Sequence, residues 1–126
     1  MCGCFALARS PDEITRAFHL TECADFSPRY NIAPGTALPT IRRSPQGDPV
    51  LHLLHWGLVP HWSKDPTIGN WLINARAETL MEKPSFRTAF LKRRCLLPAD
   101  GFYEWDHRGG TKQPYYTSSI SKIGFC

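Results

Sequence analysis

The sequence predicts an α+β domain that is rich in β-structure and carries a few short helices. Its eleven prolines and nine glycines are spread along the chain and divide it into short segments, which favours strands and loops over long helices. Most of these segments are apolar and of strand length, and only three have a helical pattern. With 126 residues, the chain is long enough for one domain that buries about two-thirds of its unfolded surface.

The first predicted element is a short helix over residues 10–18. Ser10 is suited to the N-cap position and Pro11 to the first helical position. Glu13, three residues after Ser10, would complete a capping box with it. Ile14 begins the apolar face that would pack on the rest of the domain.

A β-hairpin is predicted next, with a loop before it. Residues 37–43 and 50–56 have strand composition, and the turn over residues 44–48 joins them. Residues 29–35 are expected to form a loop because Pro34 is followed by glycine. A loop rich in Pro, Trp and His follows the hairpin, and then a strand is expected over residues 70–76. Two helices separated at Pro84 are expected over residues 77–82 and 85–92. Three further strands are expected over residues 94–98, over 102–105 and from 114 onward.

Composition excludes several classes of protein. No apolar run approaches the roughly 18 residues of a membrane span, and no basic segment precedes an apolar core at the N-terminus, so we expect a cytoplasmic protein without a membrane partner. Five cysteines are an odd number, which suits thiols in a reducing compartment. Their spacing fits no zinc site, and no phosphate-binding glycine loop is present, so we expect no metal and no cofactor. The net charge of +4 is a mild indication of polyanion binding.

The N-terminus carries the most distinctive chemistry. Removal of Met1 would leave Cys2 with a free α-amine beside its thiol, and both groups have reference pKa values near 8. Such an aminothiol reacts with an aldehyde first as an imine and then as a five-membered thiazolidine. Gly3 would let the backbone bend where a substrate approaches. The alternative is an incidental cysteine at position two.

Three other segments carry candidate site residues, each with a structural alternative. Asn74 could orient a reactive group and Arg76 could bind a phosphate, or both could lie at a solvated strand end. Glu104 stands between large aromatic residues, where burial would raise its pKa and suit it to proton transfer, or it could face solvent. Trp62 could stack on an unpaired base, or fix its loop to the core.

Taken in order, five segments resemble the SOS-response-associated peptidase (SRAP) family of abasic site processing proteins. They are residues 1–5, 29–35, 56–60, 73–79 and 95–105, and the resemblance extends from residue 1 to about Tyr116. The family implies an SRAP-like fold with a barrel-like mixed sheet and an enzyme of the peptidase and lyase type. It also implies a monomer that exposes Cys2 by autoproteolysis and crosslinks it to abasic sites in single-stranded DNA during the DNA damage response.

The resemblance further implies a role for each matching residue. Cys2 would be the crosslinking nucleophile, Asn74 would hold it and the deoxyribose, and Glu104 would move protons. The residues implied in DNA contacts and in shaping the pocket are Arg76, Trp62, Arg29, Asn31 and Pro34.

Two departures from the family pattern stand out. Cys4 occupies the position of a usual arginine, and no histidine follows His107, although the family uses a later histidine with its glutamate. We therefore expect a partial SRAP domain over residues 1–116 and a divergent tail over 117–126, truncated relative to the family. The alternatives are an inactive or misfolded remnant, which at most binds single-stranded DNA non-covalently, and an N-terminal-nucleophile glutamine amidohydrolase.

Overall fold

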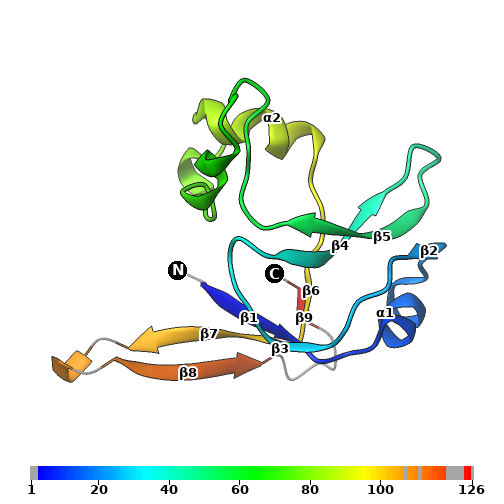
Figure 1. The fold of residues 1–126 in the computed structure, drawn as a ribbon, viewed down its shortest axis with the longest axis horizontal. Helices are drawn as coiled ribbons and strands as arrows, with labels where there is room; N and C mark the ends of the chain where they lie inside the picture. The colour runs from blue at the N-terminus through cyan, green and yellow to red at the C-terminus, as the bar shows by residue number, and fades with distance from the viewer. Residues whose placement is uncertain (1–2, 107, 111, 119–123, 126) are drawn as a thin grey trace.

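A computed structural model describes residues 3–106, 108–110, 112–118 and 124–125 (Figure 1). Its strands are β1 (Cys4–Leu7), β2 (Glu22–Cys23), β3 (Arg29–Ile32), β4 (Ala37–Arg43), β5 (Pro49–His55), β6 (Pro98–Ala99), β7 (Gly101–Asp106), β8 (Gln113–Ser118) and β9 (Gly124–Phe125). The helices are α1 (Pro11–Phe18) and α2 (Pro84–Lys92), with 3₁₀ turns η1 (Pro66–Asn70), η2 (Ala77–Thr79) and η3 (Arg108–Gly110). The α+β class is therefore confirmed.

The strands form separate sheets. One has the order β3-β1-β7-β8, another has the order β2-β5-β4, and β6 pairs with β9. The second sheet is mixed, because β2 runs parallel to β5 while β4 runs antiparallel to it. The expected barrel-like sheet is not found: within the described residues no closed barrel forms, since β3 and β8 are the outer strands of their sheet and closure requires the first and last strands to pair.

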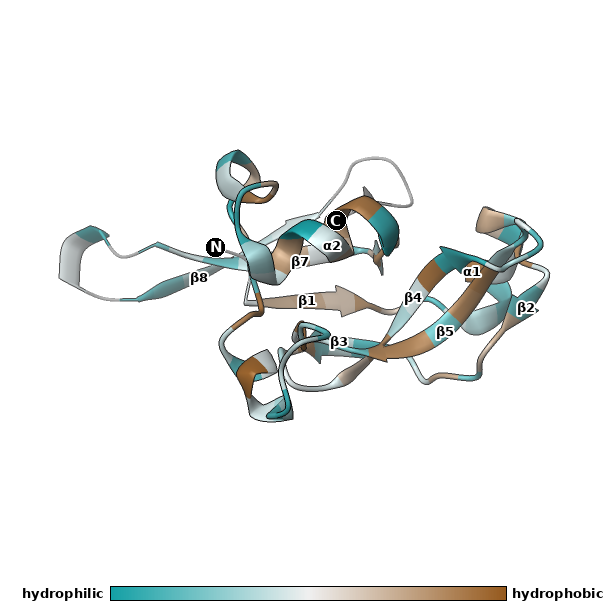
Figure 2. Cartoon of the chain, turned by 90° about the horizontal axis from the view of Figure 1, so that it is seen from above, coloured by the Kyte–Doolittle hydropathy of each residue, from teal (hydrophilic) through white to brown (hydrophobic). Residues whose placement is uncertain are grey.

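The core lies between the sheet of β1 and the hairpin of β4 and β5. Central among its fully buried side chains is Phe5 on β1, which is 2% exposed. The other members of the core cluster are Leu7, Ile14, Leu20, Ile32, Leu38, Ile41, Leu51 and Ala99. By contrast, every residue of β8 is exposed, and Figure 2 draws that strand mostly in hydrophilic colours. β1 is thus the buried strand on which the N-terminal segment rests.

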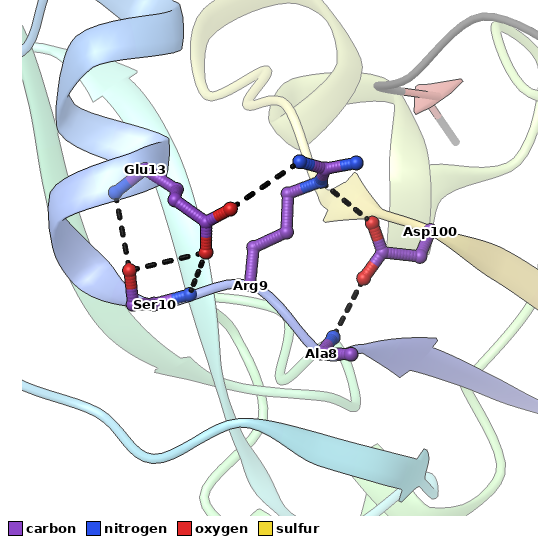
Figure 3. A network of polar contacts seen from close by, with 5 residues as sticks. All are labelled: Ala8, Arg9, Ser10, Glu13 and Asp100. Atoms are coloured by element: carbon purple, nitrogen blue, oxygen red, sulfur yellow. Dashed lines mark hydrogen bonds and ion pairs between the residues drawn. The ribbon is translucent and has the colours of Figure 1, made fainter.

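Helix α1 has the capping box that the sequence predicts. The Ser10 amide donates to Glu13 Oε2 at 2.9 Å, and the Glu13 amide donates to Ser10 Oγ at 3.3 Å (Figure 3). Pro11 occupies the first turn and Ile14 is buried against the core. His19 caps the C-terminal end of the helix in the left-handed conformation, with φ 52°.

Asp100 attaches the segment after β1 to the start of β7. Its carboxylate accepts a hydrogen bond from the Ala8 amide at 2.6 Å and from Arg9 Nε at 2.9 Å (Figure 3). Its own amide donates to the Ala6 carbonyl at 2.8 Å. Arg9 also lies 3.5 Å from Glu13, so one network connects β1, α1 and the β6–β7 junction. These contacts fix the orientation of β1, the strand that follows the N-terminal segment.

The capping box gives a prediction for pH dependence. Hydrogen bonds from Ser10 lower the pKa of Glu13, with nearby Arg9 and Arg16 adding to the effect. A lowered folded-state pKa means that the stabilisation is complete above the unfolded value of about 4.3 and is lost as pH falls through the folded value. We expect Glu13→Gln to reduce the urea midpoint of unfolding at neutral pH, and the difference from the unmodified chain to vanish in acid.

The matched control for this test is Glu22→Gln on β2. Its carboxylate makes no hydrogen bond or ion pair among the described residues, so we expect no loss of midpoint at neutral pH. A Glu13→Gln difference of equal size at neutral and acidic pH would show that the ionised carboxylate is not what stabilises the helix.

The structure differs from the sequence predictions in the type or the bounds of several elements. Residues 29–32 form β3 instead of a loop, because they pair with β1 in the register Phe5 to Ile32. Residues 71–76 are irregular instead of a strand, because their hydrogen bonds close a loop. In place of the strand over 94–98, Leu96 forms an isolated bridge with Ile41, and the two-residue strand β6 begins at Pro98. The helix over 77–82 reduces to η2, and Pro84 begins α2.

Candidate active site

Cys2 lies outside the described residues, so the site is built from the residues around it. Gly3 leads directly into β1, where Cys4 lies opposite Tyr103 and Phe5 lies opposite Phe102. Continuing this antiparallel register by one position places Gly3 opposite Glu104. Glu104 is half-buried. The carboxylate that the sequence predicts as the proton carrier is therefore on the strand beside the residue that follows Cys2.

Strand alternation separates Glu104 from its aromatic neighbours. Phe102 packs against the core, and Glu104, two residues on, lies on the same face of the sheet. Tyr103 and Trp105 lie on the other face, where the Tyr103 ring packs on Tyr116 with centroids 5.1 Å apart. Cys4, opposite Tyr103, is on that face as well. Cys4 is consequently on the opposite face of the sheet from Glu104.

Trp56 ties the Asn74 segment to β1. Its ring packs on Phe5 with centroids 5.7 Å apart, and its Nε1–H donates to the Ile73 carbonyl at 2.9 Å. Asn74, the next residue, is half-buried and lines an open pocket of about 980 Å³. Because Phe5 lies two residues from Gly3, this contact brings the Asn74 segment to the end of the domain that carries the N-terminus.

Trp62 and Trp71 are the exposed aromatic residues of the loop between β5 and η2. Trp62 is 53% exposed, so its ring is available to a ligand and does not fix the loop to the core. Trp71 is 84% exposed. The sequence analysis did not single out Trp71, which lies in the segment over residues 70–76 that it assigned to a strand. Arg76 is exposed at the end of the same segment.

Two glycines close this loop by touching each other. Leu58 donates to the Leu72 carbonyl at 3.1 Å, and a Cβ built on Gly57 would lie 2.6 Å from the Gly69 carbonyl oxygen. Gly57 also has φ +141°, which side-chain-bearing residues rarely adopt. The close approach of the two backbones therefore depends on glycine at this position.

We expect Gly57→Ala to lower stability by about 2–4 kcal/mol, combining backbone strain with the steric clash. Gly47→Ala is the matched control: its φ is +95°, but a Cβ there meets nothing within 4 Å. Urea unfolding of both variants separates the two effects, since only Gly57→Ala includes the clash. If the two variants lost the same stability, the steric clash with Gly69 would not contribute to the effect of Gly57→Ala.

The three residues predicted to shape the pocket lie on or near β3 and differ in their surroundings. The Arg29 guanidinium donates to the Ala37 carbonyl at 3.0 Å and to Thr36 Oγ1 at 3.4 Å. Arg29 lies opposite Leu7, four residues along β1 from Gly3, or about 13 Å at strand spacing. Its contacts are those of a residue that holds the start of β4. Asn31 is exposed and Pro34 is half-buried, toward the N-terminal end of β1.

The described residues contain no group of three or more His, Cys, Asp or Glu side chains able to hold a metal ion. Among them, no helix is both long and apolar enough to cross a membrane.

Comparison with known proteins identifies the family. The sequence profile described as SOS response associated peptidase (SRAP) matches residues 1–125. The chain belongs to the SRAP family. Among curated SRAP relatives, abasic site processing protein YoqW of Bacillus subtilis is 45% identical over 108 residues, which cover 83% of this chain and 48% of YoqW. Abasic site processing protein HMCES of Gallus gallus is 41% identical over 102 residues, covering 72% of this chain and 30% of HMCES.

Solved structures agree with this family fold. A protein of Bacteroides thetaiotaomicron superposes with a TM-score of 0.84 at 26% identity, covering 98% of this chain and 57% of the other. A phage-related protein of Bordetella bronchiseptica gives a TM-score of 0.70 at 32% identity, covering 97% of this chain and 57% of the other. The chain thus spans about half the length of the curated Bacillus relatives and of these structures.

Proposed function

We propose that this SRAP chain captures abasic sites in single-stranded DNA through the α-amine and thiol of Cys2. Its relatives YoqW and HMCES are named abasic site processing proteins. The observation that carries the proposal is that the residue following Cys2 continues into a buried strand whose register places Gly3 opposite the half-buried Glu104. A carboxylate near an aminothiol can carry the protons that addition to a carbonyl and loss of water require.

The chemistry requires an aldehyde, which the ring-opened sugar of an abasic site provides. The Cys2 amine adds to the C1′ carbonyl to give a carbinolamine, and loss of one water gives an imine. The thiolate then adds to the imine carbon, and the nitrogen takes up a proton. The net reaction joins aldehyde and aminothiol as a thiazolidine and releases one water, so no oxidant, reductant or metal is consumed.

The positions of the neighbouring residues support a role for each of them. Glu104 would take the proton that the amine loses and deliver one to the departing hydroxyl. Asn74, brought toward β1 by Trp56, would hydrogen-bond the sugar. Arg76 and Trp62 are exposed and would bind a flanking phosphate and an unpaired base. Asn31 and Pro34 would border the entry, whereas the contacts of Arg29 give it a supporting role.

The direct test is incubation of the chain, with Met1 removed, with two single-stranded oligonucleotides. One carries a natural abasic site, and the other carries a tetrahydrofuran site that has no aldehyde. We expect a protein–DNA adduct on a denaturing gel with the natural site alone. An adduct of equal yield with the tetrahydrofuran oligonucleotide, or no adduct with either one, would overturn the proposal.

Glu104 allows a sharper prediction about rate. We expect Glu104→Gln to slow adduct formation on the order of 10²-fold, the range for loss of a positioned acid–base group. The affinity for an intact oligonucleotide should stay unchanged, since Gln keeps the side chain's shape. Asp106→Asn, two residues along the same strand, is the control and should crosslink at the normal rate. An unchanged rate in Glu104→Gln would remove the carboxylate from the mechanism.

A second candidate is non-covalent binding of single-stranded DNA. It is favoured by two exposed tryptophans in the loop between β5 and η2. Exposed Trp62 and Trp71 would then bind bases by stacking, worth about 1–3 kcal/mol for each base. Salt-sensitive binding of the abasic oligonucleotide with no covalent product would support this function over crosslinking.

A further inference from the structure

A tyrosine on β7 makes a contact that crosses the sheet. The Tyr103 hydroxyl donates to the Tyr30 carbonyl on β3 at 2.8 Å. In this sheet, which Figure 1 shows below the β4–β5 hairpin, β1 lies between β3 and β7. The Tyr103 side chain therefore passes over β1 to reach its acceptor. Cys4 and Ala6, the residues of β1 on the same face as Tyr103, are small, which leaves space above β1 for the ring.

The acceptor of this hydrogen bond lies at an irregularity in β3. The register of β3 against β1 shifts there by one residue, between the pairs Phe5–Ile32 and Leu7–Arg29. Two residues of β3, Tyr30 and Asn31, thus lie opposite the single residue Ala6. Such a β-bulge re-aims side chains, and bulges are frequent next to active sites. Because a bulge interrupts the ladder of backbone hydrogen bonds, the contact from Tyr103 helps to decide where the bulged residues lie.

Tyr103 is itself held from the other side by Tyr116 on β8. The two residues lie opposite each other, and their rings pack with centroids 5.1 Å apart. A Cβ built on Gly101 would lie 2.6 Å from Cζ of Tyr116, so the Tyr116 ring lies directly against the backbone of β7. This packing restricts the Tyr103 ring and keeps its hydroxyl directed toward β3. One line of contacts therefore runs across all four strands of the sheet.

The bulge is one end of the segment that borders the proposed entry, residues 31–34. The other end of this segment attaches to Trp56, because the Gly35 amide donates to the Trp56 carbonyl at 2.9 Å. Asn31, at the bulge, is exposed and can reach a ligand. The segment is thus fixed at both ends, and Tyr103 fixes the end that carries Asn31.

We propose that Tyr103 is a positioning residue for DNA binding, whose hydrogen bond to the β3 bulge holds Asn31 where it contacts the strand that enters the site. The inference rests on the proposed function, in which Asn31 borders the entry. Tyr103 lies on the opposite face of the sheet from Glu104 and takes no part in the chemistry. Its loss should therefore weaken DNA binding and leave the rate of the chemical step unchanged.

The first test is Tyr103→Phe, which removes the hydroxyl and keeps the ring. We expect the affinity for the tetrahydrofuran oligonucleotide, measured by fluorescence anisotropy, to fall about fivefold, within the range for one hydrogen bond. The crosslinking rate at a saturating concentration of the natural abasic oligonucleotide should stay the same. Tyr116→Phe is the matched control: it removes the hydroxyl of the neighbouring ring, which makes no hydrogen bond among the described residues, and should bind normally.

Two further measurements separate positioning from a general loss of stability. In a chain that already carries Asn31→Ala, Tyr103→Phe should weaken binding no further, since Tyr103 acts through Asn31. Hydrogen–deuterium exchange of the DNA-free protein should be faster at the amides of residues 30–33 in Tyr103→Phe and unchanged in α1. A tyrosine that only stabilised the fold would accelerate exchange in both places.

Three results would overturn the proposal. Equal affinities of Tyr103→Phe and the unmodified chain would mean that the hydrogen bond positions no DNA contact. Additive losses in the double variant would show that Tyr103 does not act through Asn31. Unchanged exchange at residues 30–33 would mean that the hydroxyl does not hold the bulge. The exchange measurement uses no DNA and the binding measurements use an oligonucleotide without an aldehyde, so a failure of crosslinking alone leaves all three results decisive.

Discussion

Replacing Cys2 with serine is expected to eliminate the covalent adduct with an abasic oligonucleotide completely. Serine retains the α-amine and can form the imine, but its hydroxyl is a poor nucleophile at neutral pH and the imine hydrolyses back to free aldehyde and amine. Thiazolidine closure is what makes the product survive denaturation. The measurement is the adduct band on a denaturing gel, with and without borohydride, which would trap the reversible imine of Cys2→Ser as a stable amine.

A second arm of the same experiment keeps the thiol and removes the amine. A chain in which Met1 is retained has Cys2 at an internal position, where its nitrogen is an amide and cannot form an imine. The Met1 amine has no neighbouring thiol to close a thiazolidine, so we expect no adduct that survives denaturation without borohydride. Cys95→Ser is the matched control, because it removes an exposed thiol from another part of the molecule and should crosslink normally. An adduct that persists in both Cys2→Ser and the Met1-retaining chain would assign the reaction to another residue.

Phe5→Ala is expected to destabilise the protein by about 3–5 kcal/mol, the range for truncating a buried phenylalanine. Phe5 is 2% exposed, belongs to the core cluster and packs on Trp56. A domain of this size has about 5–15 kcal/mol of total stability, so the loss is a large fraction of it. Urea unfolding followed by circular dichroism measures the change.

Leu53→Ala is the control for this substitution. Leu53 lies on β5 and is 45% exposed, so removing its side chain leaves no internal cavity and should change stability by about 0.5 kcal/mol or less.

Phe5→Ala should also slow crosslinking at temperatures where the variant is still folded, because Phe5 positions Trp56 and, through Trp56, the Asn74 segment. If the free energy of unfolding of Phe5→Ala lay within about 1 kcal/mol of that of the unmodified chain, Phe5 would not have a central place in the core.

Local signals in the sequence were sufficient for part of the fold. The capping pair Ser10 and Glu13 located α1, and the turn over 44–48 located the hairpin to within one residue of β4 and β5. β1 and β3 carry no comparable local signal. They are strands because Phe5 lies between Ile32 and Phe102, partners that are distant in the sequence. Such pairings depend on the three-dimensional arrangement and not on local propensity.

The candidate site was predictable to a similar extent. The residue types at Cys2, Asn74 and Glu104 suggested the chemistry, and the roles of these three residues stay a prediction. The position of the Asn74 segment beside β1 could not be predicted, because it depends on Trp56, which packs on Phe5 and donates to the Ile73 carbonyl. The exposure of Trp71 could not be predicted either, because the loop that carries it is closed by a contact between Gly57 and Gly69.

The Asp100 network has a consequence for how the protein is made. The residues that Asp100 holds, Ala6, Ala8 and Arg9, emerge from the ribosome more than 90 residues before it does. At typical translation speeds of about 5–20 residues per second, the N-terminus therefore waits roughly 5 to 20 seconds before its strand can be enclosed. Enzymes that process nascent chains can act on the residue ahead of Cys2 during that interval, when no folded surface yet obstructs them.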